Sequence, residues 1–98
     1  MDASLPTTRL IVYGHDYCPQ SRLLKNTLAQ QQIDHEWRDV MEGDPRYKDE
    51  LRGLARGNLS VPTVIFPDGT VLIEPWPQDV LHQLNPVRPN LLQRLLTR

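Results

Sequence analysis

Apolar residues follow two different periods along the chain, and the periods alternate. Short apolar or β-branched runs bounded by Gly, Pro or Asp predict strands, and the mixed segment around Trp37 predicts an edge strand half exposed to water. Apolar residues three or four apart, such as Leu24 and Leu28 with Leu23 beside them, predict helices. The predicted strands are 9–13, 35–40, 60–66 and 71–73, and the predicted helices are 19–32, 45–55 (capped by Asp44), 78–84 and 90–96.

The order of these elements predicts the fold class. A strand, a helix and a second strand in succession require parallel strands joined by a right-handed crossover. Asp68-Gly69 lies between two apolar strands and predicts an antiparallel hairpin. Together they predict an α/β domain of order βαβαββα, with a four-stranded mixed sheet between helices. We expect one domain over 1–98, in which 1–8 is a loose leader and 86–98 a C-terminal helical extension.

Composition and charge argue against several classes of protein. Eleven Lys and Arg against twelve Asp and Glu give a net charge of −1, without the basic patch of a nucleic-acid-binding protein. No apolar run approaches the ~18–20 residues that span a bilayer, and the first residues lack the basic and apolar regions of a signal peptide. A single cysteine forms no internal disulfide and needs no oxidising compartment. We therefore expect a cytoplasmic protein, a monomer, with no nucleic-acid or membrane partner.

Cys18 lies where a strand ends and a helix begins, at the end of the sheet where α/β proteins bind ligands. Pro19 suits the first helical position, because the N–H that proline lacks would be unpaired there. The free N–H groups and the dipole of a helix N-terminus favour negative charge, and the thiolate is the nucleophilic form of cysteine. A lone cysteine is more often a small buried hydrophobe, but Tyr17 and Pro19 are poor neighbours for a core position. The position indicates a reactive thiol.

Two motifs resemble those of the glutaredoxin family, in particular its mycoredoxin-like branch. They are Tyr-Cys-Pro-Gln-Ser at 17–21 after a strand, and Ser-Val-Pro at 60–62 before a hairpin. The family carries Cys-Pro-x-Cys, or a monothiol form ending in Ser, and later Thr-Val-Pro. The resemblance covers about residues 9–84. It implies the thioredoxin fold and a monothiol thiol–disulfide oxidoreductase with Cys18 as the catalytic residue. It further implies that substrate is bound by His15, Tyr17, Pro19, Gln20, Ser21, Ser60, Val61 and Pro62.

The resemblance also implies a cis peptide bond between Val61 and Pro62, next to Cys18. In the family this bond turns the preceding residue toward the substrate. The N–H and C=O of Val61 would then pair with the bound thiol like an added strand. On the residues alone, a proline at the start of a strand is the simpler interpretation of Pro62.

Several positions depart from the family pattern. Ser21 replaces the second cysteine, so the chemistry runs through one sulfur. His15 stands where many members have lysine, and Leu59 where an arginine is often found. The glycine pair and aspartate that hold the γ-glutamyl end of glutathione are absent from 73–76. The resemblance implies no permanently bound cofactor, S-thiolated proteins as partners, and a low-molecular-weight thiol (glutathione, mycothiol or bacillithiol) as co-substrate.

Two other functions stay open. Monothiol glutaredoxins can hold a shared [2Fe–2S] cluster with one cysteine per subunit and two glutathiones, and a thioredoxin-fold module can bind partners without catalysis. His15 and Cys18 have zinc-like spacing, but no second ligand pair accompanies them, so we expect no metal site. His15 is better interpreted either as a partial positive charge near the thiolate or as an ordinary exposed histidine of the turn. We expect Trp37 and Trp76 to be packing residues, with Trp76 alternatively a wall of the groove.

Overall fold

The structure is a computed structural model, and it describes residues 9–84. The expected leader at 1–8 and the C-terminal extension, with its helix at 90–96, lie outside the described residues. Between residues 9 and 84 no helix is long and apolar enough to cross a membrane. The elements are β1 (Leu10–Gly14), α1 (Pro19–Gln30), β2 (His35–Asp39), α2 (Arg46–Leu54), β3 (Thr63–Ile65), β4 (Val71–Ile73) and α3 (Pro77–Leu84).

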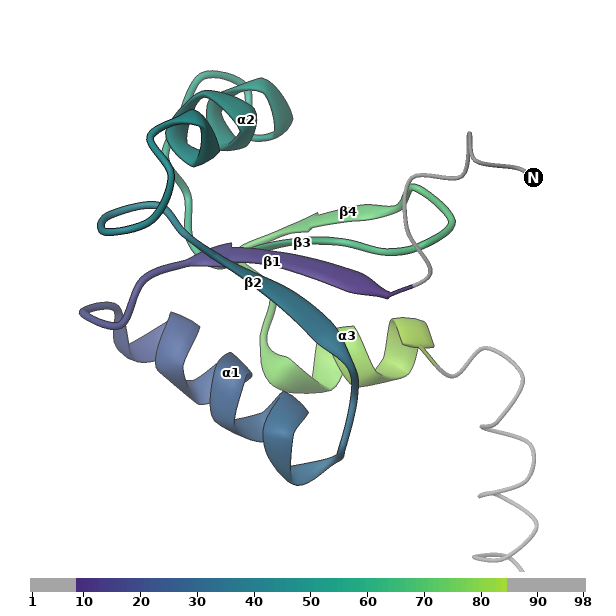
Figure 1. Cartoon of the computed structure of the whole chain (residues 1–98). Coiled ribbons are helices and arrows are strands. Elements are labelled where there is room, and N and C mark those ends of the chain that lie inside the picture. The colour runs from purple at the N-terminus through teal and green to yellow at the C-terminus, as the bar shows by residue number, and fades with distance from the viewer. Residues whose placement is uncertain (1–8, 85–98) are drawn as a thin grey trace, which may run out of the picture.

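The strands form one mixed sheet in the order β2-β1-β3-β4. β1 and β2 run parallel, with Val12 opposite Trp37, and β3 is antiparallel to both β1 and β4. In Figure 1, α1 and α3 cover one face of the sheet and α2 covers the other. This is the arrangement of the thioredoxin fold, so the predicted fold class and the predicted edge position of β2 are confirmed.

Successive side chains of β1 point to opposite faces of the sheet and enter two separate cores. The core under α1 and α3 contains Leu10, Val12, Leu24, Leu28, Val64, Phe66 and Val80, and the core under α2 contains Ile11, Tyr13, Val40, Leu51 and Ala55. Leu23 joins neither core and is 47% exposed, although the helical period placed it beside Leu24. α1 presents only a narrow stripe to the sheet, so a neighbouring position faces water.

β3 is shorter than the predicted 60–66, because residues 60–62 turn before the strand begins. The Val61–Pro62 bond is cis, as the resemblance implies, and Pro62 has no N–H for a strand ladder. The Thr63 hydroxyl donates a hydrogen bond of 2.8 Å to the Ser60 carbonyl oxygen and holds this turn. The register with β1 therefore begins at Thr63, which lies opposite Tyr13.

The helix boundaries differ from prediction by one or two residues. α1 ends at Gln30 because Gln32 adopts a positive φ of 57°, and the N–H of Ile33 bonds back to the Leu28 carbonyl oxygen. α2 begins at Arg46, and Pro45 rather than Asp44 occupies the N-cap. The Asp44 carboxylate nevertheless accepts the Arg46 N–H at 2.9 Å and the Arg46 guanidinium at 2.9 Å. These bonds to Arg46 lower the pKa of Asp44.

Candidate functional site

One end of the sheet gathers four connecting segments. β1 and β2 end there because they are parallel, and β3 begins and β4 ends there because each reverses direction. Figure 1 shows these segments around the start of α1. We call this region the cysteine end; it comprises residues 14–18, 40–45, 58–62 and 74–76. The topology thus brings the motif around Cys18 next to the Ser-Val-Pro motif, although more than forty residues separate them.

Cys18 is the N-cap of α1, with Pro19 in the first turn as predicted. Its thiol is half-buried, and Sγ accepts the Ser21 backbone N–H at 3.5 Å. The S–H points to the Val61 carbonyl oxygen at 4.0 Å. The Cys18 N–H donates to the His15 carbonyl oxygen at 3.2 Å, which closes the turn before the helix. The sulfur therefore faces both the helix N-terminus, which favours a negative charge, and the cis-proline turn.

A second hydrogen bond joins the cis-proline turn to the segment after β4. The Glu74 N–H donates to the Pro62 carbonyl oxygen at 2.7 Å, one step beyond the last ladder pair of β3 and β4. Glu74 has a φ of 54°, in the left-handed region that non-glycine residues seldom adopt. Pro62 is buried and Val61 half-buried. The backbone beside the sulfur is thus held on both sides.

Ser21 occupies the position of a second cysteine and is fully buried. Its hydroxyl has no hydrogen-bond partner within residues 9–84. Ser21 contacts the Cys18 sulfur through its backbone N–H, at 3.5 Å. A Cβ at Gly14 would lie 2.9 Å from the Ser21 hydroxyl and 2.8 Å from the Trp37 ring. Gly14 therefore permits the close approach of α1 to the sheet directly behind Cys18.

Trp37 is a packing residue, as predicted, and it also connects to the loop before Cys18. It packs against the core under α1 and α3. The Lys25 ammonium lies 4.4 Å from the Trp37 ring centroid and 3.1 Å from the Asp16 carboxylate. Lys25 thus links β2, α1 and the loop that contains Asp16. Sequence reasoning missed this link, because only the parallel register of β1 and β2 brings Trp37 behind α1.

Tyr17 extends from the loop toward the neighbouring segment after β2. It is 70% exposed, and its hydroxyl donates to the Glu42 carboxylate at 2.6 Å. This bond raises the pKa of Tyr17. Asp39 orders the same segment, because its carboxylate accepts the N–H groups of Met41 and Glu42 at 2.8 and 2.7 Å. The contribution of Glu42 to the cysteine end has no local sequence signal.

His15 and Gln20 make no hydrogen bond to the sulfur through their side chains in the described part of the chain. The His15 ring lies 6.2 Å from the Tyr17 ring, centroid to centroid, and its Nδ1 is buried with no partner within residues 9–84. Gln20 is half-buried on the first turn of α1. A charge on His15 near the thiolate and a substrate contact from Gln20 therefore stay predictions.

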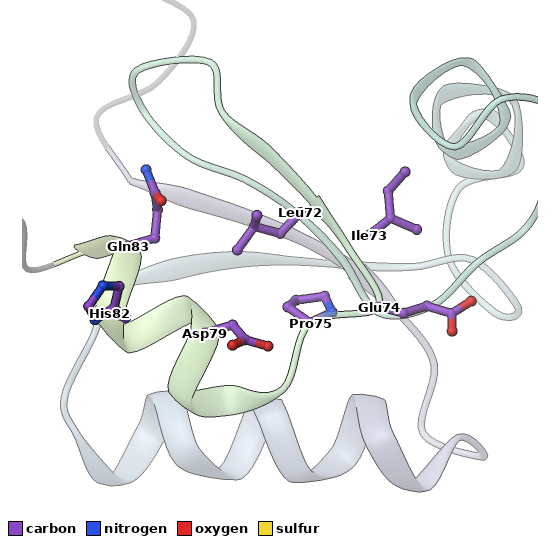
Figure 2. Close-up of a pocket in the computed structure, with 7 residues that line it drawn as sticks. All are labelled: Leu72, Ile73, Glu74, Pro75, Asp79, His82 and Gln83. Atoms are coloured by element: carbon purple, nitrogen blue, oxygen red, sulfur yellow. The ribbon is translucent and has the colours of Figure 1, made fainter.

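Several exposed apolar side chains and one open hollow border the cysteine end. The exposed apolar residues in or beside its segments are Tyr17, Met41, Leu59, Ile73 and Trp76. A hollow of about 340 Å³ lies between β4 and α3 and is lined by Leu72, Ile73, Glu74, Pro75, Asp79, His82 and Gln83. Figure 2 shows these side chains. Cys18 does not line this hollow, which meets the cysteine end through Glu74 and Pro75. No group of three His, Cys, Asp or Glu suited to a metal ion occurs between residues 9 and 84.

Comparisons with known proteins agree with this geometry. Glutaredoxin grx-1 from Archaeoglobus fulgidus superposes with a TM-score of 0.69 at 15% identity, over 82% of this chain and 89% of that one, which shows a shared fold. The thioredoxin-like protein BC3987 superposes with a TM-score of 0.62 at 28% identity, over 78% and 99% of the two chains. No curated protein matches the sequence. The glutaredoxin family model matches residues 10–72, well over half of the chain. The chain belongs to the glutaredoxin family.

Proposed function

We propose that this protein reduces mixed disulfides between proteins and a low-molecular-weight thiol, with Cys18 as its only reacting sulfur. Its family supports a thiol–disulfide oxidoreductase. The observation that carries the finer proposal is the setting of Cys18. The half-exposed sulfur accepts the Ser21 N–H at the start of α1, beside the Val61 carbonyl. The family's second cysteine is replaced by Ser21, so no second sulfur is available to resolve an intermediate.

The reaction then runs in two balanced exchanges. The Cys18 thiolate attacks the small-thiol sulfur of a protein–S–S–R disulfide, so that a Cys18–S–S–R bond forms and the protein leaves as a thiolate that takes up a proton. The thiolate of a free R–SH then attacks the sulfur of the R group in the Cys18–S–S–R bond. R–S–S–R leaves, and Cys18 regains its thiolate. Each turnover thus consumes one free R–SH and releases R–S–S–R, and the sulfur of the substrate protein is reduced to a thiol.

The remaining predicted residues would shape substrate binding. Val61 would offer its backbone N–H and C=O to the cysteinyl part of the substrate, with Ser60 and Pro62 setting the turn. Tyr17 and the neighbouring exposed apolar side chains suit contact with a protein. Cytoplasmic location belongs to the same proposal, since low-molecular-weight thiols keep that compartment reducing.

Replacement of the reacting sulfur tests the proposal. Cys18→Ser is expected to abolish both the mixed disulfide on the protein, detected by mass spectrometry, and turnover of an S-thiolated peptide. The fold should persist, with a thermal midpoint near that of the wild type, because the side chain is half-buried and the two residues are close in size. Glutathione, mycothiol and bacillithiol assayed in parallel would identify the thiol. Residual turnover in the variant would contradict the proposal, and a large fall in the midpoint would indicate a packing role for Cys18.

A further inference from the structure

Glu74 places a carboxylate beside the cis-proline turn. Its backbone N–H bonds to Pro62 at 2.7 Å, and the carbonyl of the preceding Val61 faces the Cys18 sulfur at 4.0 Å. Glu74 is exposed, and its carboxylate makes no hydrogen bond or ion pair within residues 9–84. Figure 2 shows the side chain pointing away from α3, toward the end of the sheet that carries the loop before α1.

The other carboxylates of the cysteine end are already engaged. Asp16 pairs with Lys25, Glu42 accepts the Tyr17 hydroxyl, and Asp44 pairs with Arg46. Asp39, at the end of β2, accepts two backbone N–H groups. Glu74 is thus the carboxylate left available to a substrate in this part of the described chain.

The adjoining hollow has the same sign of charge. Its wall next to Glu74 is Pro75 and Leu72, and Asp79 on α3 lies beyond them. Asp79 accepts the Trp76 N–H at 2.9 Å through one oxygen. Among residues 9–84, no lysine or arginine lines the hollow. Arg22 lies one turn beyond Cys18 on α1, and Arg56 lies in the loop after α2, so both are on other elements.

We infer that Glu74 is a specificity-determining residue, which makes the exchange site prefer a thiol with an ammonium-bearing tail over one with a carboxylate-bearing tail. The inference rests on the proposed exchange at Cys18. A tail attached to a sulfur at Cys18 and running past the Val61–Pro62 turn meets Glu74 first and then the hollow. A positive tail is attracted there, whereas a tail that ends in a carboxylate is repelled.

The test uses one peptide carrying mixed disulfides with three tails of matched length. They derive from cysteamine (ammonium), 2-mercaptoethanol (hydroxyl) and 3-mercaptopropionate (carboxylate). The rate of Cys18–S–S–R formation is followed by mass spectrometry in the wild type and in Glu74→Gln. Because the three thiols differ in intrinsic reactivity, the readout for each tail is the ratio of the wild-type rate to the variant rate.

At low ionic strength the ratio should be about threefold above one for the ammonium tail and about threefold below one for the carboxylate tail, as expected for unit charges some ångströms apart in a mostly aqueous setting. It should be near one for the hydroxyl tail, and the two departures should shrink in high salt. Glu74→Lys should reverse this preference: relative to the wild type, its rates should favour the carboxylate tail over the ammonium tail.

Asp68→Asn is the matched control, because it removes one negative charge at the hairpin turn, which lies at the opposite end of β4. It should leave all three rates unchanged. Equal ratios for the three tails, or the same pattern in Asp68→Asn, would overturn the role of Glu74 while the exchange at Cys18 stands. Failure of every tail to form a mixed disulfide on Cys18 would instead overturn the proposed function.

Discussion

Val12 and Tyr13 are neighbours on β1, yet their side chains enter environments of opposite character. Val12 is fully buried under α1 and α3 among aliphatic and aromatic carbon atoms. Tyr13 is equally hidden under α2, but its hydroxyl donates to Glu50 at 2.8 Å and accepts from Arg38 at 2.7 Å. One face is therefore held by apolar packing, and the other by packing together with ionisable groups.

The network under α2 extends over two rings and two carboxylates. The Arg38 guanidinium lies 5.5 Å from the ring centroids of Tyr13 and Tyr47 and bonds to Glu36 at 2.7 Å. Burial, followed by the bond to Glu50, raises the pKa of Tyr13 to about 12. Burial lowers the pKa of Arg38, but the bonds to Glu36 and Tyr13 outweigh it and raise that pKa overall.

This difference between the two faces of the sheet matters for Cys18, because Cys18 is the N-cap of α1. A core of apolar side chains has no proton to gain or lose, so pH leaves the packing under α1 unchanged. α2 depends in part on groups that titrate. We therefore expect the stability of the protein at high pH to be set by the α2 face, and the geometry of Cys18 to be set by the α1 face.

The largest expected effect comes from replacing one buried leucine on each face, which should separate the two roles. Leu24→Ala on α1 and Leu51→Ala on α2 each empty a fully buried site, and each should cost about 2–5 kcal/mol of unfolding free energy. Both are measured by urea unfolding. At a temperature where both variants are folded, only Leu24→Ala should slow exchange at Cys18. Equal slowing in the two variants would remove the distinction between the faces.

High pH should destabilise the α2 face through Tyr13. Its pKa is raised from 10.0 to about 12 in the folded state, so folding favours the neutral phenol. This contribution is fully present below pH 10 and is lost as the pH rises toward 12, amounting to at most about 3 kcal/mol. Tyr13→Phe cannot ionise. The difference in unfolding free energy between wild type and variant, measured from pH 8 to pH 12, should therefore fall with pH. A constant difference would contradict the raised pKa.

Gly14→Ala should test the close approach behind Cys18. The new methyl group would meet the Trp37 ring at 2.8 Å and the Ser21 hydroxyl at 2.9 Å. Overpacking of this kind costs about 1–3 kcal/mol. The shift of the first turn of α1 should also slow alkylation of Cys18 by iodoacetamide in the folded protein. Gly53→Ala on α2, where a methyl group meets nothing, is the control. It should leave the alkylation rate unchanged and should not lower the stability, because alanine favours a helix over glycine by about 0.5–1 kcal/mol. An unchanged alkylation rate in Gly14→Ala would limit Gly14 to a packing role.

Ser21→Cys should have the smallest effect on stability, because serine and cysteine differ little in size. The Ser21 N–H lies 3.5 Å from the Cys18 sulfur, so position 21 is within reach of an internal disulfide under mild oxidation. Closure would compete with the small thiol on Cys18. Direct reduction of protein disulfides should therefore rise, and turnover of small-thiol mixed disulfides should stay equal or fall. If no internal disulfide forms, the first turn of α1 is not oriented as in a glutaredoxin site.

Local patterns predicted much of this molecule. The hairpin followed from Asp68-Gly69, because Gly69 adopts a φ of 93° and the Asp68 carboxylate accepts the Thr70 N–H within the same turn. The place of Cys18 before α1 followed from a strand, a short turn and Pro19 in succession. Local patterns did not predict those boundaries that tertiary contacts decide. Residues 60–62 have strand-like composition, yet the cis-proline turn keeps them outside β3.

The sequence by itself determined the order of the elements, the fold class, and the residue that carries the sulfur, because helix and strand periods and turn preferences act over a few neighbouring residues. Only the tertiary structure decided that Trp37 and Ser21 meet at Gly14, that Tyr17 reaches Glu42, and that Glu74 bonds to the turn beside Cys18. These partners lie on different elements and far apart in the chain. Their contact depends on the register of the strands and on how closely α1 approaches the sheet, which no local spacing encodes.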